Sequence, residues 1–83
     1  MPSFLMEEFT IYAKSGCGFC DKLAAFMTNK GIPHKKLMLG EDYSKDRFLV
    51  EFGRTTFPRV IHKGEVIGGM RETIAYLADN GYV

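Results

Sequence analysis

The segment EFTIYAKSGCGFCDKLAAFMTNKGIP, residues 8–33, changes its hydrophobic period at Cys17. From about Glu8 to Ala13, apolar residues alternate with Thr10 and Tyr12, and strong β formers predominate, so a strand is predicted. Beyond Cys17, apolar residues recur at i, i+3, i+4 and i+7, which predicts a helix with one buried face. That face consists of Cys20, Leu23, Ala24 and Met27.

The middle of the chain predicts a second strand and a second helix. Gly31 is placed to end the first helix, and Pro33 prevents it from resuming before a strand in HKKLMLG, residues 34–40. Ser44 can cap the next helix, which we expect to end near Gly53. That helix carries Phe48, Leu49 and Phe52.

The last third of the chain predicts a hairpin followed by a helix. Residues 58–69, PRVIHKGEVIGG, read as two short strands joined at Lys63–Gly64, and residues 70–81 read as a helix that stops at Gly81. We expect the inward face of this helix to hold Met70, Ile74, Leu77 and Ala78. The predicted order is βαβαββα, a single α/β domain over residues 1–83 whose first strand–helix–strand unit forms a right-handed parallel crossover.

Composition narrows the class of protein. With 83 residues, 46% of them hydrophobic, the chain suits one small domain with its own core. A formal net charge of +1 without blocks of like charge disfavours nucleic-acid binding. The N-terminal MPSFLMEEFT has neither a basic region nor a long apolar run, so we expect no signal peptide and no membrane span. We therefore expect a cytoplasmic protein, in a compartment where thiols are kept reduced.

Cys17 and Cys20 are the two cysteines of the chain, and their position favours redox chemistry. Helix residues three apart have Cβ atoms about 5–6 Å apart, whereas a disulfide needs about 3.5–4.5 Å, so the pair can close only at the start of the helix. Free N–H groups and the helix dipole stabilise a thiolate there, and Lys14 can add a cation, so we expect the pKa of Cys17 to lie below the ~8.5 of a free thiol. A low pKa also makes Cys17 a good leaving group.

Two other interpretations of the pair fit less well. A C-x2-C motif followed by His34 resembles the opening of a zinc finger, but no histidine occupies residues 38–40, and His62 lies far beyond. We therefore expect no metal, with both histidines structural. As a staple, a four-residue loop contributes only about 2 kcal/mol in the chain-entropy model. A pair that opens and closes during turnover is the favoured interpretation.

Three separated motifs together resemble glutaredoxin, a thioredoxin-fold reductase that uses glutathione. They are IYAKSGCGFC, RTTFP and VIGGMRE, in that order over nearly the whole chain. The resemblance implies a four-stranded mixed sheet flanked by three helices, in agreement with the order predicted from the pattern. It also implies an enzyme that reduces protein disulfides and glutathionylated proteins, with Cys17 as the exposed nucleophile and Cys20 as the resolving thiol.

The resemblance further implies a glutathione site. Lys14 corresponds to a residue that helps bind the glycine carboxylate, and Pro58 to a cis-proline whose preceding residue pairs with the cysteinyl part of glutathione. Gly68–Gly69 corresponds to the glycine pair that admits the γ-glutamyl end. Apart from this resemblance, Glu72 can pair back onto the glycine pair as a helix cap. The full implied set is Lys14, Tyr12, Phe19, Arg54, Thr56, Phe57, Pro58, Gly68, Gly69, Met70 and Arg71.

Two residues depart from the family pattern. Arg71 stands where a small or acidic residue is usual, and it can pair with a carboxylate but not with an ammonium group. Phe57 is bulkier than the usual valine and is expected to narrow the groove. We expect a monomer, with glutathione and disulfide-containing proteins as partners and ribonucleotide reductase as one candidate.

Three alternatives stay open at this point. One is a redoxin of the same fold that is recharged by thioredoxin reductase. Another is a carrier of a [2Fe–2S] cluster held by Cys17 from two chains, because CGFC is similar to the CGFS of single-thiol glutaredoxins; Cys20 and the lack of their insertions speak against it. The third is a partner-binding domain whose thiols are incidental.

Overall fold

The computed structural model of the protein describes residues 8–53 and 56–83. Within these residues the elements follow the predicted βαβαββα order. They are β1 (Phe9–Ala13), α1 (Gly18–Asn29), β2 (His34–Met38), α2 (Lys45–Phe52), β3 (Arg59–His62), β4 (Glu65–Gly68) and α3 (Met70–Asp79).

The four strands form one mixed sheet in the order β2-β1-β3-β4. Strand β1 pairs in parallel with β2, with Phe9 opposite His34, and antiparallel with β3, with Ile11 opposite Val60. Strands β3 and β4 form an antiparallel hairpin. The β1–α1–β2 unit is therefore the parallel crossover that the alternation of periods predicted.

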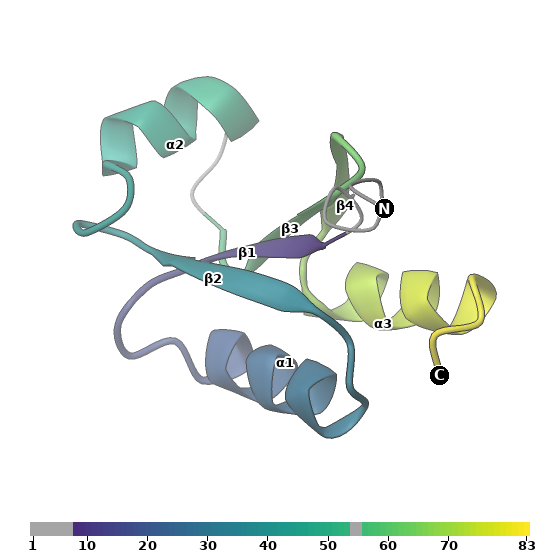
Figure 1. Ribbon diagram of the computed structural model, residues 1–83. Helices are drawn as coiled ribbons and strands as arrows, with labels where there is room; N and C mark the ends of the chain where they lie inside the picture. Colours follow the sequence, from purple (N-terminus) through teal and green to yellow (C-terminus); the bar gives the residue numbers. More distant parts are fainter. Residues whose placement is uncertain (1–7, 54–55) are drawn as a thin grey trace.

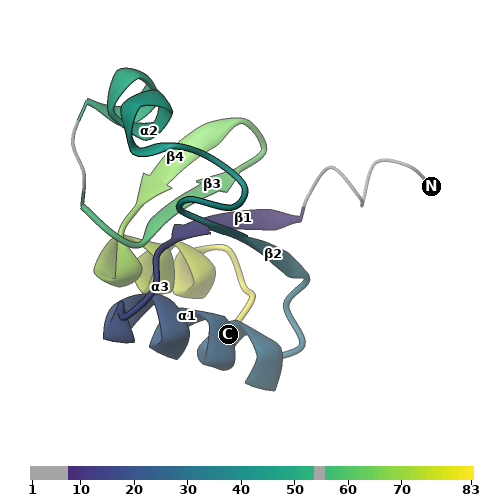
Figure 2. The same ribbon diagram turned by 90° about the vertical axis from the view of Figure 1, so that its left-hand side faces the viewer.

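The helices lie in two layers, with the sheet between them (Figure 1). Helices α1 and α3 lie side by side on one face, and α2 lies alone on the other, which the turned view confirms (Figure 2). The fold is thus the predicted four-stranded mixed sheet flanked by three helices. In the part of the chain that the structure describes, no helix combines the length and the apolar character that crossing a bilayer requires.

The face toward α1 and α3 holds the main core. Alternate residues of β1 point into it, and α1 contributes the predicted stripe, apart from Ala24, which is only partly buried. Each large apolar side chain buried here contributes about 1.5–3 kcal/mol relative to an exposed one. The fully buried members include Phe9, Ile11, Cys20, Leu23, Met27, Val60 and Leu77.

The face toward α2 is built from aromatic rings. Phe48 is 1% exposed and packs against Phe52, Phe57 and Tyr43 at ring-centroid distances of 4.6, 4.7 and 5.5 Å. Tyr12, from the other face of β1, meets Tyr43 edge-on at 5.0 Å. This aromatic cluster holds α2 against the sheet.

Several local predictions are confirmed and two are wrong. Ser44 caps α2 by accepting a hydrogen bond from the Arg47 N–H at 3.1 Å, and Lys63–Gly64 turns the hairpin with positive φ at both residues. Leu49, one of the three apolar residues named for α2, is 46% exposed because Phe48 and Phe52 fill the face toward the sheet.

The inward face of α3 differs from the prediction at one residue. Ala78 is exposed, whereas Thr73 and Leu77 are buried and Met70 and Ile74 are partly buried. The helix is rotated so that its buried stripe runs through Thr73, a residue that hydrophobicity alone does not mark as inward. The second strand is also shorter than expected, ending at residue 38.

Candidate redox site and substrate groove

The two cysteines lie where β1 passes into α1. Cys17 is the N-cap of α1, with extended φ of −93° and ψ of 104°, so its side chain points back across the first turn. The Cys20 N–H donates a hydrogen bond to the Cys17 Sγ at 3.2 Å. The two residues form a disulfide, with their Cα atoms 5.3 Å apart. The pair closes because Cys17 has not entered the helix, as the spacing argument required.

The cysteines differ in their access to solvent. Cys17 is 8% exposed, and Cys20, which belongs to the hydrophobic core, is fully buried. The expectation of an exposed Cys17 therefore needs correction for the disulfide form, because Cys17 also packs with the hydrophobic core. Cys17 is still the cysteine that an external sulfur can approach.

A groove of about 510 Å³ begins at the residue between the two cysteines. Phe19, between the two cysteines, is 61% exposed and forms one of its walls. The groove joins the first turn of α1 to the first two turns of α3. Its lining residues are Phe19, Phe57, Pro58, Met70, Arg71, Glu72 and Ile74.

A second hollow of about 330 Å³ continues the groove along the end of β4. Both hollows share Phe57, Pro58 and Glu72, so they form one surface. The Phe57–Pro58 peptide bond is cis, as the resemblance implied. The lining residues of the second hollow are Thr56, Phe57, Pro58, Arg59, Gly68, Gly69 and Glu72.

Of the two glycines Gly68 and Gly69, only Gly68 has a backbone conformation and surroundings that require a glycine. Its φ is +131°, and a Cβ placed on it would lie 2.8 Å from the Glu72 Cβ. Gly69 has an ordinary φ of −90°, and a Cβ there would meet its nearest neighbour, the Glu72 Oε1, at 3.4 Å. The tight approach of β4 to α3 therefore depends on Gly68.

Glu72 caps the start of α3. Its Oε1 accepts a hydrogen bond from the Gly69 N–H at 3.0 Å, the capping arrangement that the sequence suggested. Hydrogen bonds from its own N–H and from that of Gly69 lower the pKa of Glu72, and the charges of Arg71 and Arg59 lower it further. The Glu72 carboxylate therefore stays ionised in the groove.

Lys14 is connected to the groove through Phe57. Its Nζ lies over the Phe57 ring, 5.4 Å from the centroid, which is within cation–π distance. Phe57 in turn stacks on Phe48 at 4.7 Å. Phe57 thus positions Lys14 at the edge of the groove, and narrowing of the groove by its ring stays a prediction.

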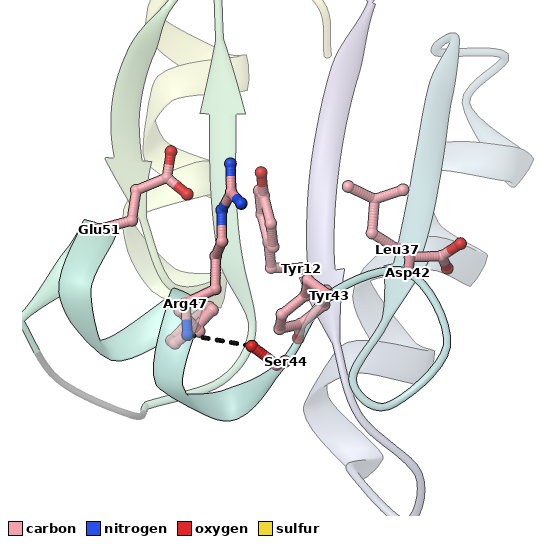
Figure 3. Close-up of a pocket in the computed structure, with 8 residues that line it drawn as sticks. Tyr12, Leu37, Asp42, Tyr43, Ser44, Arg47 and Glu51 are labelled. Atoms are coloured by element: carbon pink, nitrogen blue, oxygen red, sulfur yellow. Dashed lines mark hydrogen bonds between the residues drawn. The ribbon is translucent and has the colours of Figure 1, made fainter.

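Tyr12, in contrast, does not line this groove. It points into a separate cavity of about 520 Å³ on the α2 face, together with Arg47 and Glu51 (Figure 3). Burial and the charge of Glu51 raise the pKa of Tyr12 above 10.0, against a smaller lowering by Arg47. Alternation along β1 explains the placement, because residue 12 faces away from residues 11 and 13.

Of the remaining site predictions, Arg54 lies outside the described residues. Phe19, Thr56, Met70 and Arg71 line the groove, and their role in binding glutathione stays a prediction. Arg59 and Ile74 also line it, and the sequence analysis missed both. The alternation of β3 and the i+4 spacing from Met70 could have indicated them.

The histidines play structural parts. His34 Nδ1 donates to the Ile32 carbonyl oxygen at 2.9 Å. His62 is buried, stacks on Phe9 at 3.8 Å and has its Nδ1 2.8 Å from the Tyr76 hydroxyl. Within residues 8–53 and 56–83, no group of three or more histidine, cysteine or acidic side chains is arranged to hold a metal ion.

Comparison with known proteins agrees with this geometry. The Glutaredoxin family model matches residues 9–67. Hybrid peroxiredoxin hyPrx5 of Haemophilus influenzae is 34% identical over 74 residues, which cover 89% of this chain and 31% of that protein. Glutaredoxin 3 of Escherichia coli K12 is 29% identical over 77 residues, covering 92% and 93% of the two chains.

Among solved structures, a buckwheat glutaredoxin–glutathione complex has the same fold. Its TM-score is 0.71 at 22% identity, over 95% of this chain and 77% of that one. The chain spans less than a third of the hybrid peroxiredoxin but nearly all of Glutaredoxin 3. Because the family model covers more than half of its length, the chain belongs to the glutaredoxin family of thiol–disulfide oxidoreductases.

Proposed function

We propose that this glutaredoxin uses glutathione to reduce protein disulfides and glutathionylated proteins in the cytoplasm. The Cys17 thiolate attacks one sulfur of the substrate disulfide; that bond breaks, a mixed disulfide forms, and the other substrate sulfur leaves as a thiolate. The Cys20 thiolate then attacks the Cys17 sulfur and releases the second substrate thiolate. Two electrons have passed to the substrate, and the Cys17–Cys20 disulfide remains.

Glutathione closes the cycle. One glutathione thiolate attacks the Cys17 sulfur, which frees Cys20 and leaves glutathione bound to Cys17. A second glutathione removes the first as oxidised glutathione and restores the Cys17 thiolate. For a glutathionylated protein, Cys17 alone accepts the glutathione, and Cys20 is not needed.

The observation that carries this proposal is the hydrogen bond from the Cys20 N–H to the Cys17 Sγ at the start of α1. The same N–H stabilises a Cys17 thiolate after reduction, because the helix N-terminus favours negative charge. This makes Cys17 both an attacking group and a good leaving group, and Cys20 lies within bonding distance to resolve the mixed disulfide.

The groove supports glutathione as the reductant. Lys14 offers a cation for the glycine carboxylate, and Gly68 and Gly69 line the second hollow, where we place the γ-glutamyl end. The buckwheat relative of the same fold was solved as a glutathione complex. Recharging by thioredoxin reductase is the alternative, and the two reductants are separated by comparing recharging rates with each.

A peroxiredoxin is a candidate protein substrate, beside ribonucleotide reductase. The relative from Haemophilus influenzae is named a hybrid peroxiredoxin, and this chain matches 31% of its length. A dithiol of this kind can reduce an oxidised peroxiredoxin cysteine that has formed a disulfide with glutathione or a second cysteine. Peroxide consumption by a peroxiredoxin with this protein and glutathione, set against the same mixture with Cys17→Ser, tests the pairing.

The deciding experiment uses two matched variants. Cys20→Ser, mixed with oxidised glutathione, is expected to form a single glutathione adduct on Cys17, detected by mass spectrometry. It should keep reduction of a glutathionylated protein and lose most protein-disulfide reduction, whereas Cys17→Ser should lose both. Survival of both activities in Cys17→Ser would reverse the assigned roles, and a [2Fe–2S] chromophore in an anaerobic preparation with glutathione would favour the cluster-carrier alternative.

A further inference from the structure

We propose that Arg71 selects protein substrates that carry an acidic side chain close to the reactive cysteine. The inference rests on the proposed function and specifies the class of protein that the groove accepts. Arg71 lies in the first turn of α3 and lines the same groove as Phe19, the residue between the two cysteines. It is also one of the two residues at which this chain departs from the pattern of its family.

The groove suits a polypeptide segment. Five of its lining residues are apolar or aromatic, and Phe19 is 61% exposed next to the disulfide. It extends as far as Ile74, in the second turn of α3. An apolar side chain of a docked segment can therefore lie between Phe19 and α3 while the sulfur of that segment reaches Cys17. The apolar residues are Phe19, Phe57, Pro58, Met70 and Ile74.

The charged groups around the groove favour an anionic partner. Lys14, Arg59 and Arg71 contribute three positive charges, and Glu72 contributes one negative charge. The Glu72 carboxylate is engaged by the Gly69 N–H at 3.0 Å. Arg59 donates to the Thr56 hydroxyl through its guanidinium. The Glu72 carboxylate thus has a partner. Arg59 keeps its charge, its buried Nε has no hydrogen-bond partner among the described residues, and it lines the second hollow rather than the one that holds Phe19.

Arg71 and Lys14 remain, and of the three positive groups Arg71 is the one that lines the hollow with Phe19. Within the described part of the chain, neither forms an ion pair, although the Arg71 charge contributes to the low pKa of Glu72. Lys14 lies over Phe57, at the side of the groove assigned to glutathione. Arg71 borders the apolar part, where a planar guanidinium can bind a carboxylate with two hydrogen bonds. We therefore assign Arg71 to an aspartate or glutamate of the protein substrate.

The test isolates the step in which the protein substrate reacts. Fully reduced protein is mixed with a peptide disulfide in the absence of glutathione, quenched in acid, and the released peptide thiol is quantified. The Cys17 thiolate attacks one sulfur of the peptide disulfide and forms a mixed disulfide, and the other peptide sulfur leaves as a thiolate. The Cys20 thiolate then attacks the Cys17 sulfur and releases the bound peptide sulfur as a thiolate. The peptide disulfide has gained two electrons, and the Cys17–Cys20 disulfide has formed. Because no glutathione is present, its carboxylates cannot account for an effect of Arg71.

Three peptides of identical length differ only in the residues flanking the cysteine: glutamates, glutamines or lysines. We expect the wild-type second-order rate constant to be highest for the glutamate peptide. Arg71→Ala should lower the glutamate-to-glutamine ratio about two- to fivefold, the range of one exposed ion pair. Arg71→Glu should shift the preference toward the lysine peptide. The wild-type preference should also shrink as salt is raised from about 10 mM to about 0.5 M.

Arg47→Ala is the matched control. It removes the same side chain and the same charge, but Arg47 lines the cavity on the α2 face and not the groove. Its glutamate-to-glutamine ratio should equal that of the wild type. Equal ratios for Arg71→Ala and the wild type, or equal losses in Arg47→Ala and Arg71→Ala, would overturn the proposal. If no variant reduced any peptide or a small neutral disulfide, the proposed function itself would fail.

Discussion

The two faces of the sheet are packed by different kinds of side chain and have different roles. Under α1 and α3, mainly aliphatic side chains from helices and strands form a core that includes Cys20. Under α2, the rings around Phe48 form the contact, and a cavity of about 520 Å³ lies beside them (Figure 3). The redox pair therefore belongs to the face that holds the main core, and the cavity lies on the other face.

Phe57 connects the faces. It stacks on Phe48 in the aromatic cluster, lines the groove next to Pro58, and carries Lys14 over its ring. The face toward α1 and α3 supplies the reacting sulfurs, whereas the aromatic face toward α2 sets the position of one groove wall and of one cation. Changes on the α2 face should therefore alter substrate binding more than sulfur chemistry.

The largest effect is expected from Phe48→Ala. Phe48 is 1% exposed, and removing its ring should lower the free energy of unfolding by about 3–5 kcal/mol, because apolar contacts are lost and a cavity remains. Urea denaturation measures the loss. Native-state hydrogen exchange should show that the amides of α2 lose protection first, since this ring anchors the helix.

Leu23→Ala is the counterpart on the other face. It should cost about 2–5 kcal/mol and should reduce protection in α1, the helix that carries the cysteines. If Phe48→Ala weakened α1 as much as α2, the two faces would unfold as one unit, and the comparison drawn above would be wrong.

Gly68→Ala should have the next largest effect. With φ of +131° and a new Cβ 2.8 Å from the Glu72 Cβ, the substitution should cost about 1–3 kcal/mol in backbone strain, to which the steric contact adds. Thermal unfolding measures it. Gly69→Ala is the control, because its φ is −90°, and it should cost clearly less. Equal losses would show that Gly68 is not held in this conformation.

Tyr43→Phe should destabilise the α2 face by about 1 kcal/mol, the value of one hydrogen bond. The Tyr43 hydroxyl donates to the Ala13 carbonyl oxygen at 2.6 Å. Burial, with a smaller contribution from the charges of Tyr12 and Asp42, raises the pKa of Tyr43 from 10.0 to about 12. This contribution is therefore complete below pH 10 and is lost as the pH rises toward 12.

The measurement for Tyr43→Phe is the free energy of unfolding from pH 7 to 11. The variant and the wild type should differ most at neutral pH and converge at the alkaline end. A constant difference across the range would argue against the role of the hydroxyl.

The smallest effect is expected from Glu72→Gln. Because the folded-state pKa of Glu72 lies below 4.5, its carboxylate stabilises the folded state at neutral pH, and this stabilisation is lost as the pH falls below 4.5. The melting temperature of the variant should lie slightly below that of the wild type at pH 7. The two should converge in acid, and a gap that widened there would contradict the capping role.

Much of the fold followed from periodicity. Alternation in residues 9–13, the change of period at Cys17 and the Lys63–Gly64 turn predicted the strands, the first helix and the hairpin, because these signals are local. The exposure of Leu49 and the error at Ala78 have one cause. A short helix with several small or apolar residues can be rotated without breaking its pattern, and contacts with the sheet decide the rotation.

The site was predicted unevenly for the same reason. The cysteine pair depends on local geometry at the start of a helix, so its closure could be derived from spacing. The groove depends on the meeting of α1, the Phe57–Pro58 turn and α3, and only a family resemblance indicated it. That resemblance grouped Tyr12 with the groove, although the alternation of β1 turns it toward α2.

The amino-acid sequence by itself determined the order of elements and the place of the redox pair, since both follow from hydrophobic period, turn residues and the three-residue spacing of Cys17 and Cys20. Only the tertiary structure decided which side chains share the groove and which charges remain free in it. Arg71 shares its hollow with Phe19 and Phe57, residues far from it in the chain that no local pattern relates.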